Sequence, residues 1–142
     1  MKLTPREAKP YFARPDPART GLLIYGSDAM RVAIKRQEYL KALLGPAAEE
    51  EMRLTRIPAG DLRREPALLM DAIKAVGFFP GPRAAFVEGA NELVAQIIID
   101  TMADWRAGDA QLIVTAGDLK KTSKLLKAFE GHRDAYAWGI FD

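Results

Sequence analysis

The chain has 142 residues with 21 basic and 19 acidic side chains, a length that suits one domain and a charge too even to indicate nucleic-acid binding by itself. It has no cysteine and a single histidine, His132, which excludes a disulfide framework, a thiolate nucleophile and a multi-histidine metal site. No apolar run approaches the length of a membrane span and the first residues lack a signal core, so we expect a cytoplasmic protein.

The first third of the chain predicts a helix, a strand and a second helix. Residues 4–7 combine a threonine cap, a proline and a glutamate, and predict the start of a helix that Pro10 and Pro15 keep short. The apolar run at 21–26 lies between glycines and predicts a buried strand of a parallel sheet. Ser27 or Asp28 can then cap a helix over about 30–44. The residues expected to face the core from that helix are Ala33, Ile34, Leu40, Leu43 and Leu44.

In the middle of the chain, residues 52–57 alternate in polarity and predict a strand, and Gly60-Asp61 predicts a loop. Apolar residues then recur at helical spacing, which predicts one buried helical stripe ending before Pro80-Gly81-Pro82. Its members are Leu68, Leu69, Ala72, Ile73 and Val76. A short buried strand is expected at 84–87, followed by a turn at 88–91.

The last third continues the alternation. Asn91 is expected to cap a helix over 92–106, and a strand is expected at 111–116. Asp118 is then expected to cap a helix over 120–129, and a final strand is expected at 135–141. The buried side of the first of these helices is expected to present Leu93, Val94, Ile97, Ile98, Met102 and Trp105. Five strands separated by helices predict an α/β fold: a mostly parallel five-stranded sheet with helices on both faces.

Phe78 and Phe79 stand next to each other between the helix that ends near Gly77 and the strand at 84–87. A buried pair is one interpretation, because phenylalanine is usually buried. An exposed pair would instead be a small hydrophobic anchor for a groove on another protein. Periodicity alone does not choose between these two alternatives.

The strand-to-helix junction at 26–31 lies where nucleotide-binding sheets hold phosphate. It lacks the Gly-Lys-Ser/Thr ending of a P-loop, and Asp28 would repel a phosphate. A nucleotide-binding or nucleotide-hydrolysing domain is therefore an alternative that the chemistry of this loop disfavours.

Two groups of charged residues have a functional and an ordinary interpretation. Lys120, Lys121 and Lys124 follow a strand end and could contact an anion or DNA phosphate, although charge runs are ordinarily solvated. The aspartates at positions 100, 104 and 109 have no acid, base or nucleophile beside them, so a metal or acid–base role is disfavoured.

Three segments in order resemble the N-terminal domain of the delta subunit of the bacterial DNA polymerase III clamp loader. They are LLIYGSDAMRVAIKRQ at 22–37, DAIKAVGFFPGPRAAFVEG at 71–89 and QLIVTAGDLKKTSKLLKAF at 111–129. Together with their spacing, the likeness covers essentially all 142 residues. It implies a RecA-like, AAA+-type domain with a degenerate P-loop and without a cofactor or catalytic residues of its own.

The resemblance also implies a function in DNA replication. A delta subunit binds the ring-shaped sliding clamp, the beta subunit, through a hydrophobic plug and holds one interface of the ring open. Phe78 and Phe79 occupy the plug positions, with Gly77 where a serine is common and Lys74 where a glutamine is common. Val76 and Arg83 would frame the contact.

The family's subunit continues into a lid domain and a C-terminal collar domain, and this chain ends before both. We therefore expect a truncated form or fragment of a non-catalytic subunit of the polymerase III holoenzyme. Contacts with the gamma, tau and delta prime subunits would use mainly the missing domains, and DNA would be met in the assembled complex. No membrane contact is expected.

Overall fold

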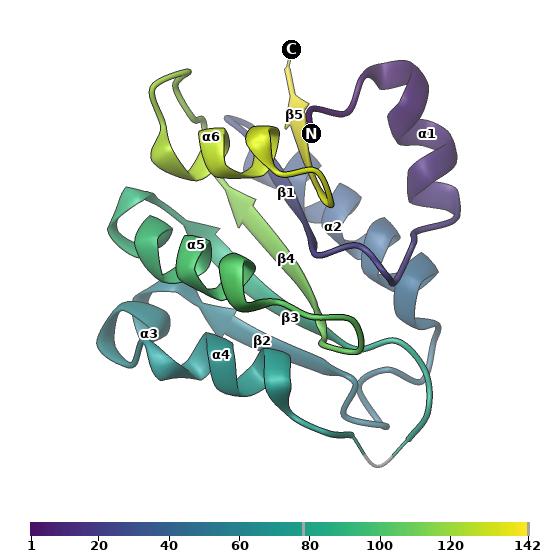
Figure 1. Ribbon diagram of the computed structural model, residues 1–142. Helices are drawn as coiled ribbons and strands as arrows, with labels where there is room; N and C mark the ends of the chain where they lie inside the picture. The colour runs from purple at the N-terminus through teal and green to yellow at the C-terminus, as the bar shows by residue number, and fades with distance from the viewer. Residues whose placement is uncertain (78, 142) are drawn as a thin grey trace.

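The computed structural model describes residues 1–77 and 79–141. In this part of the chain five strands form one all-parallel sheet in the order β2-β3-β4-β1-β5 (Figure 1). Their bounds are Gly21–Gly26 for β1, Leu54–Pro58 for β2, Ala84–Ala90 for β3, Gln111–Ala116 for β4 and Ala135–Ile140 for β5. The α/β prediction is confirmed, and the sheet is parallel throughout.

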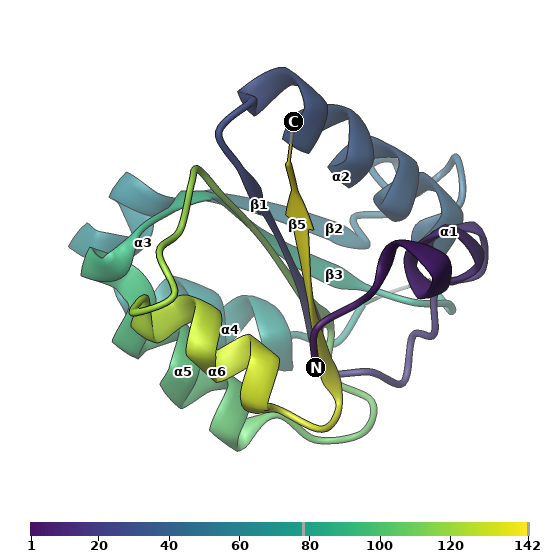
Figure 2. The ribbon, with the colours of Figure 1, turned by 90° about the horizontal axis from the view of Figure 1, so that it is seen from above.

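The helices cover both faces of the sheet. One face carries α1 and α2, and the opposite face carries the remaining helices (Figure 2). The helices are α1 Pro5–Ala13, α2 Ala29–Leu44, α3 Ala59–Arg64, α4 Ala67–Lys74, the 3-10 helix η1 Glu92–Val94, α5 Ala95–Asp104 and α6 Lys124–Gly131. The connection from β1 to β2 moves toward one edge of the sheet, and the later connections move toward the other edge. Because crossovers between parallel strands are right-handed, the first connection covers one face and the later ones cover the opposite face.

Several local signals lead to the expected structure. All six residues of β1 are buried, and this strand has a partner on each side. Thr4 caps α1 with the full capping box, and the Asp28 carboxylate caps α2. The first helix is short, as expected, but it includes Pro10 and ends at Ala13.

Several expected boundaries are wrong. Gly60-Asp61 lies inside α3, where Asp61 falls in the first turn and fully buried Leu62 anchors the helix. The turn expected at 88–91 begins only after β3 has continued to Ala90, with a register shift after Val87. The helix expected over 92–106 is divided into η1 and α5. The helix expected from 120 begins at Lys124, because Ser123 and not Asp118 provides its cap.

Some residues expected in the core lie in solvent. Ile34 on α2 and Leu93 in η1 are exposed, whereas Tyr39 of α2 is fully buried. Burial raises the pKa of the Tyr39 hydroxyl, which donates to Gln111 Oε1 at 2.5 Å. The Gln111 amide in turn donates to the carbonyls of Asp16 and Arg19, so this network ties the loop after α1 to α2 and β4.

A parallel sheet has two chemically different edges. The loops after β1 and β4 lie at the carboxyl edge, whereas the loops before β3 and β4 lie at the amino edge. Among the described residues, no helix combines the length and apolar character that crossing a bilayer requires.

Candidate protein-binding surface

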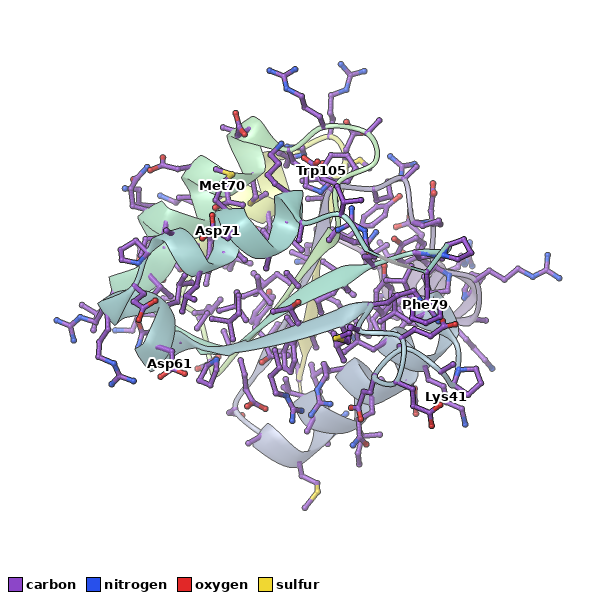
Figure 3. The ribbon with its side chains drawn as sticks, turned by 90° about the horizontal axis from the view of Figure 1, so that it is seen from below. Lys41, Asp61, Met70, Asp71, Phe79 and Trp105 are labelled. Atoms are coloured by element: carbon purple, nitrogen blue, oxygen red, sulfur yellow. The ribbon has the colours of Figure 1, made fainter. Side chains whose placement is uncertain are left out.

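The loop between α4 and β3, residues 75–83, lies at the amino edge and presents apolar side chains to solvent. The helix ends at Lys74, so Val76 leaves the buried stripe and is 93% exposed. Phe79 is 44% exposed and lies on the opposite side of the molecule from Asp61 of α3 (Figure 3). Phe78 lies outside the described residues. For Phe79, the exposed alternative holds.

The two ends of the 75–83 loop are held by the segment between α5 and β4. Lys74, at the first end, pairs through Nζ with Asp109 Oδ2 at 2.5 Å and with Asp104 Oδ2 at 3.3 Å. Arg83, at the other end, donates from Nη2 to the Gly108 carbonyl at 2.8 Å and from Nη1 to the Ala75 carbonyl. The same segment therefore holds both ends of the loop close together, and we call these contacts of Lys74 and Arg83 the neck of the loop. Both residues, which were expected to contact the clamp, already have partners within the chain.

The electrostatics of this neck favour the ionised forms. The hydrogen bond to Asp109 raises the pKa of Lys74. Burial acts to raise the pKa of Asp109, but the hydrogen bonds from Lys74 and the Arg106 amide outweigh it and lower that pKa. The pair is therefore ionised at neutral pH. Its contribution is lost as the pH falls through the lowered pKa of Asp109, or as it rises through the raised pKa of Lys74.

Arg53 supports the 75–83 loop through a hydrogen bond to its backbone, and no sequence pattern predicted this role. Arg53 is 6% exposed. Its Nε donates to Glu51 Oε1 at 2.7 Å, and its Nη1 donates to the Pro82 carbonyl at 3.0 Å. Gly81 has φ +113°, and a Cβ added at this position would meet the Arg53 Nη1 atom at 3.6 Å. No local sequence pattern predicts this contact, because Arg53 donates to a carbonyl that lies 29 positions away in the sequence.

The arrangement suits recognition of an apolar cavity on a protein. Val76 and Phe79 lie on a loop whose two ends are held by charged groups, which lowers the ordering entropy lost on binding. A groove of about 190 Å³ adjoins the loop and is lined by Met52, Ala72, Val76, Gly77 and Arg83, among others.

At the carboxyl edge, an internal carboxylate already contacts the helix start beside the three lysines. Lys120 and Lys121 are exposed in the turn before α6, and Lys124 Nζ donates to Gln96 Oε1. The Glu92 carboxylate accepts from the Lys124 amide at 2.6 Å and from the Ser123 hydroxyl at 2.9 Å. An internal anion thus occupies the amide position at which a phosphate would bind the helix start.

The start of α2, directly after β1, is also occupied by a carboxylate of the chain. Asp28 Oδ1 accepts from the amides of Met30 and Arg31 at 3.1 and 3.2 Å, so the helix start that would cradle a phosphate is already capped. A crevice of about 230 Å³ between β1, β3 and β4 lies beside it and is lined by Gly26, Ala29, Arg36, Phe86, Glu88 and Gly117, among others. Among the described residues, no group of three or more histidine or carboxylate side chains is placed to hold a metal ion.

We expect ATP with magnesium to leave the melting temperature of the chain unchanged up to millimolar concentration. Asp28 would have to leave the α2 amides before a phosphate could reach them, and it would repel the phosphate otherwise. A thermal-shift titration beside a P-loop ATPase as positive control measures this. A saturable rise in melting temperature would restore the nucleotide-binding alternative.

The chain matches no model of a known protein family, and comparison with curated proteins gives no match. The function must therefore be argued from the chain's own residues.

Proposed function

We propose that this chain is a protein-binding module of the clamp-loader type, which binds a bacterial sliding clamp through the 75–83 loop and assists its opening. The observation that supports this most directly is the exposure of Val76 and Phe79 on a loop with a closed neck. Such a loop at the end of a helix has the form of the hydrophobic plug that the resemblance implies.

The carboxyl edge supports the same proposal. In the sheet order β2-β3-β4-β1-β5, the loop after β1 lies beside the end of β4, where P-loop proteins hold their nucleotide. Here the loop lacks the lysine of a P-loop, and the Asp28 carboxylate caps the following helix. These features are those expected of a RecA-like, AAA+-type domain whose P-loop has degenerated.

In this proposal the chain has no catalysis or cofactor of its own and acts in the cytoplasm during DNA replication. The sliding clamp is its direct partner. Other loader subunits would be engaged mainly by lid and collar domains, and DNA would be met within the assembled loader. We do not propose DNA binding as the main role, since Glu92 fills the start of α6 beside Lys124.

The test is a biolayer titration of this chain against the purified sliding clamp of the same organism. We expect saturable binding with a dissociation constant on the order of 1–100 µM, because a single small loop must offset the entropy of association. The variant Leu93→Ala is the matched control, since Leu93 is also an exposed apolar residue but lies at the carboxyl edge. Absence of wild-type binding at these concentrations would overturn the proposal.

A further inference from the structure

Met52 is a second exposed apolar element beside the 75–83 loop. Its residue is 69% exposed, and it lines the same groove as Val76 and Gly77. The sequence pattern places Met52 in a strand, but β2 begins only at Leu54. The methionine therefore belongs to the turn that precedes the strand.

The backbone at Met52 has a conformation typical of glycine. Its φ is +55°, and among the described residues it alone has a positive φ without being glycine. The Met52 amide donates to the Glu49 carbonyl at 3.1 Å and the Arg53 amide to the Ala48 carbonyl at 2.8 Å. This is the Schellman arrangement, in which glycine is strongly preferred at the position that Met52 occupies.

A long apolar side chain at this position costs stability and gains little burial within the chain. Non-glycine residues held in the left-handed region persist where the surroundings impose them, and they cluster at binding sites. Methionine is also a flexible, polarizable side chain that adapts to apolar surfaces of a partner. The combination of strain, exposure and residue type points to contact with another molecule.

Arg53 connects the turn that contains Met52 to the 75–83 loop. It directly follows Met52, and its guanidinium donates to the Pro82 carbonyl at 3.0 Å. The distance between the two apolar elements is therefore constrained by a partly buried hydrogen bond. A partner that covers Val76 would meet Met52 along the groove that both residues line.

We infer that Met52 is a further anchor for the sliding clamp, next to the 75–83 loop. This inference rests on the proposed function and deepens it by extending the binding surface from one loop to two. Met52 contributes apolar contact to the clamp, and Arg53 acts as a positioning residue that holds the two elements in register.

The test compares Met52→Gly and Met52→Ala with Met30→Ala in the clamp titration, together with their melting temperatures. Met30 is an equally exposed methionine, at 70%, on α2 and away from the groove. We expect Met52→Gly to weaken binding about tenfold, the scale of one apolar anchor. The same variant should raise the melting temperature by a few degrees, because glycine relieves the left-handed strain.

The outcomes separate this inference from the proposed function. Weaker binding by a chain that is at least as stable supports the anchor, because loss of folding cannot explain it. Wild-type affinity in both Met52 variants, with loss of binding in Phe79→Ala, overturns the anchor and leaves the proposed function standing. Failure of the wild-type chain to bind the clamp overturns both.

Discussion

The double variant Phe78→Ala/Phe79→Ala is expected to lose clamp binding by more than about 100-fold while the fold is retained. Two phenyl side chains that become buried contribute roughly 3–6 kcal/mol of gross apolar free energy. For a module that binds with a dissociation constant of about 1–100 µM, a 100-fold loss moves that constant to about 0.1–10 mM. The titration described above measures the loss directly.

The single variant Phe79→Ala tells the two phenylalanines apart. Phe79 is already half in solvent, so its truncation should leave the melting temperature nearly unchanged. Circular dichroism and the melting curve of each variant establish that a lost signal is not lost folding. If the double variant binds the clamp as tightly as Leu93→Ala does, the assignment of the plug to this loop is wrong.

The elements that the sequence predicts well are those whose signals are local. The apolar run of β4 and the cap at Asp28 use residues that lie within a few positions of one another, and both are confirmed. The parallel sheet follows from the alternation of such segments, because parallel strands need crossover connections. Local signals therefore suffice for the order of the elements and for the class of fold.

The start of α6, which was misplaced, depends partly on a contact with a residue far away in the sequence. The α6 helix begins at Lys124 because Glu92, 32 positions earlier, accepts hydrogen bonds from its first amide. An aspartate at position 118 gives a typical local cap signal, but the distant carboxylate and the Ser123 hydroxyl satisfy the helix start instead.

The candidate site was predicted in part. The aromatic pair and the proline-rich breaker at 80–82 indicate a loop with apolar residues, and Phe79 is exposed there. The helical period extends the buried stripe to Val76, but the helix ends before it, so that residue joins the exposed surface. Met52 and Arg53 were missed as parts of the site because a positive φ and a partly buried long-range contact leave no local pattern.

Arg53→Ala is expected to have the second large effect, on both stability and binding. It leaves the Pro82 carbonyl without its donor and the partly buried Glu51 carboxylate without its cation. Losing one partner of such partly buried polar contacts costs about 1–3 kcal/mol, which corresponds to a fall in melting temperature of roughly 5–10 °C. At a temperature where the variant is still folded, clamp binding should fall about tenfold, because an unbraced loop must be ordered on association.

The conservative variant Arg53→Lys distinguishes bracing from charge. Lysine keeps the positive charge beside Glu51 but has one nitrogen, so it cannot reproduce the two contacts that Nε and Nη1 make in different directions. We therefore expect it to recover part of the stability while clamp binding stays weakened. Arg64→Ala is the control, since Arg64 is exposed on α3 and its pair with Asp61 should contribute less than about 1 kcal/mol. A melting temperature for Arg53→Ala equal to that of Arg64→Ala would show that the 75–83 loop does not depend on this contact. Its rigidity would then have to come from the Lys74 and Arg83 contacts at its neck alone.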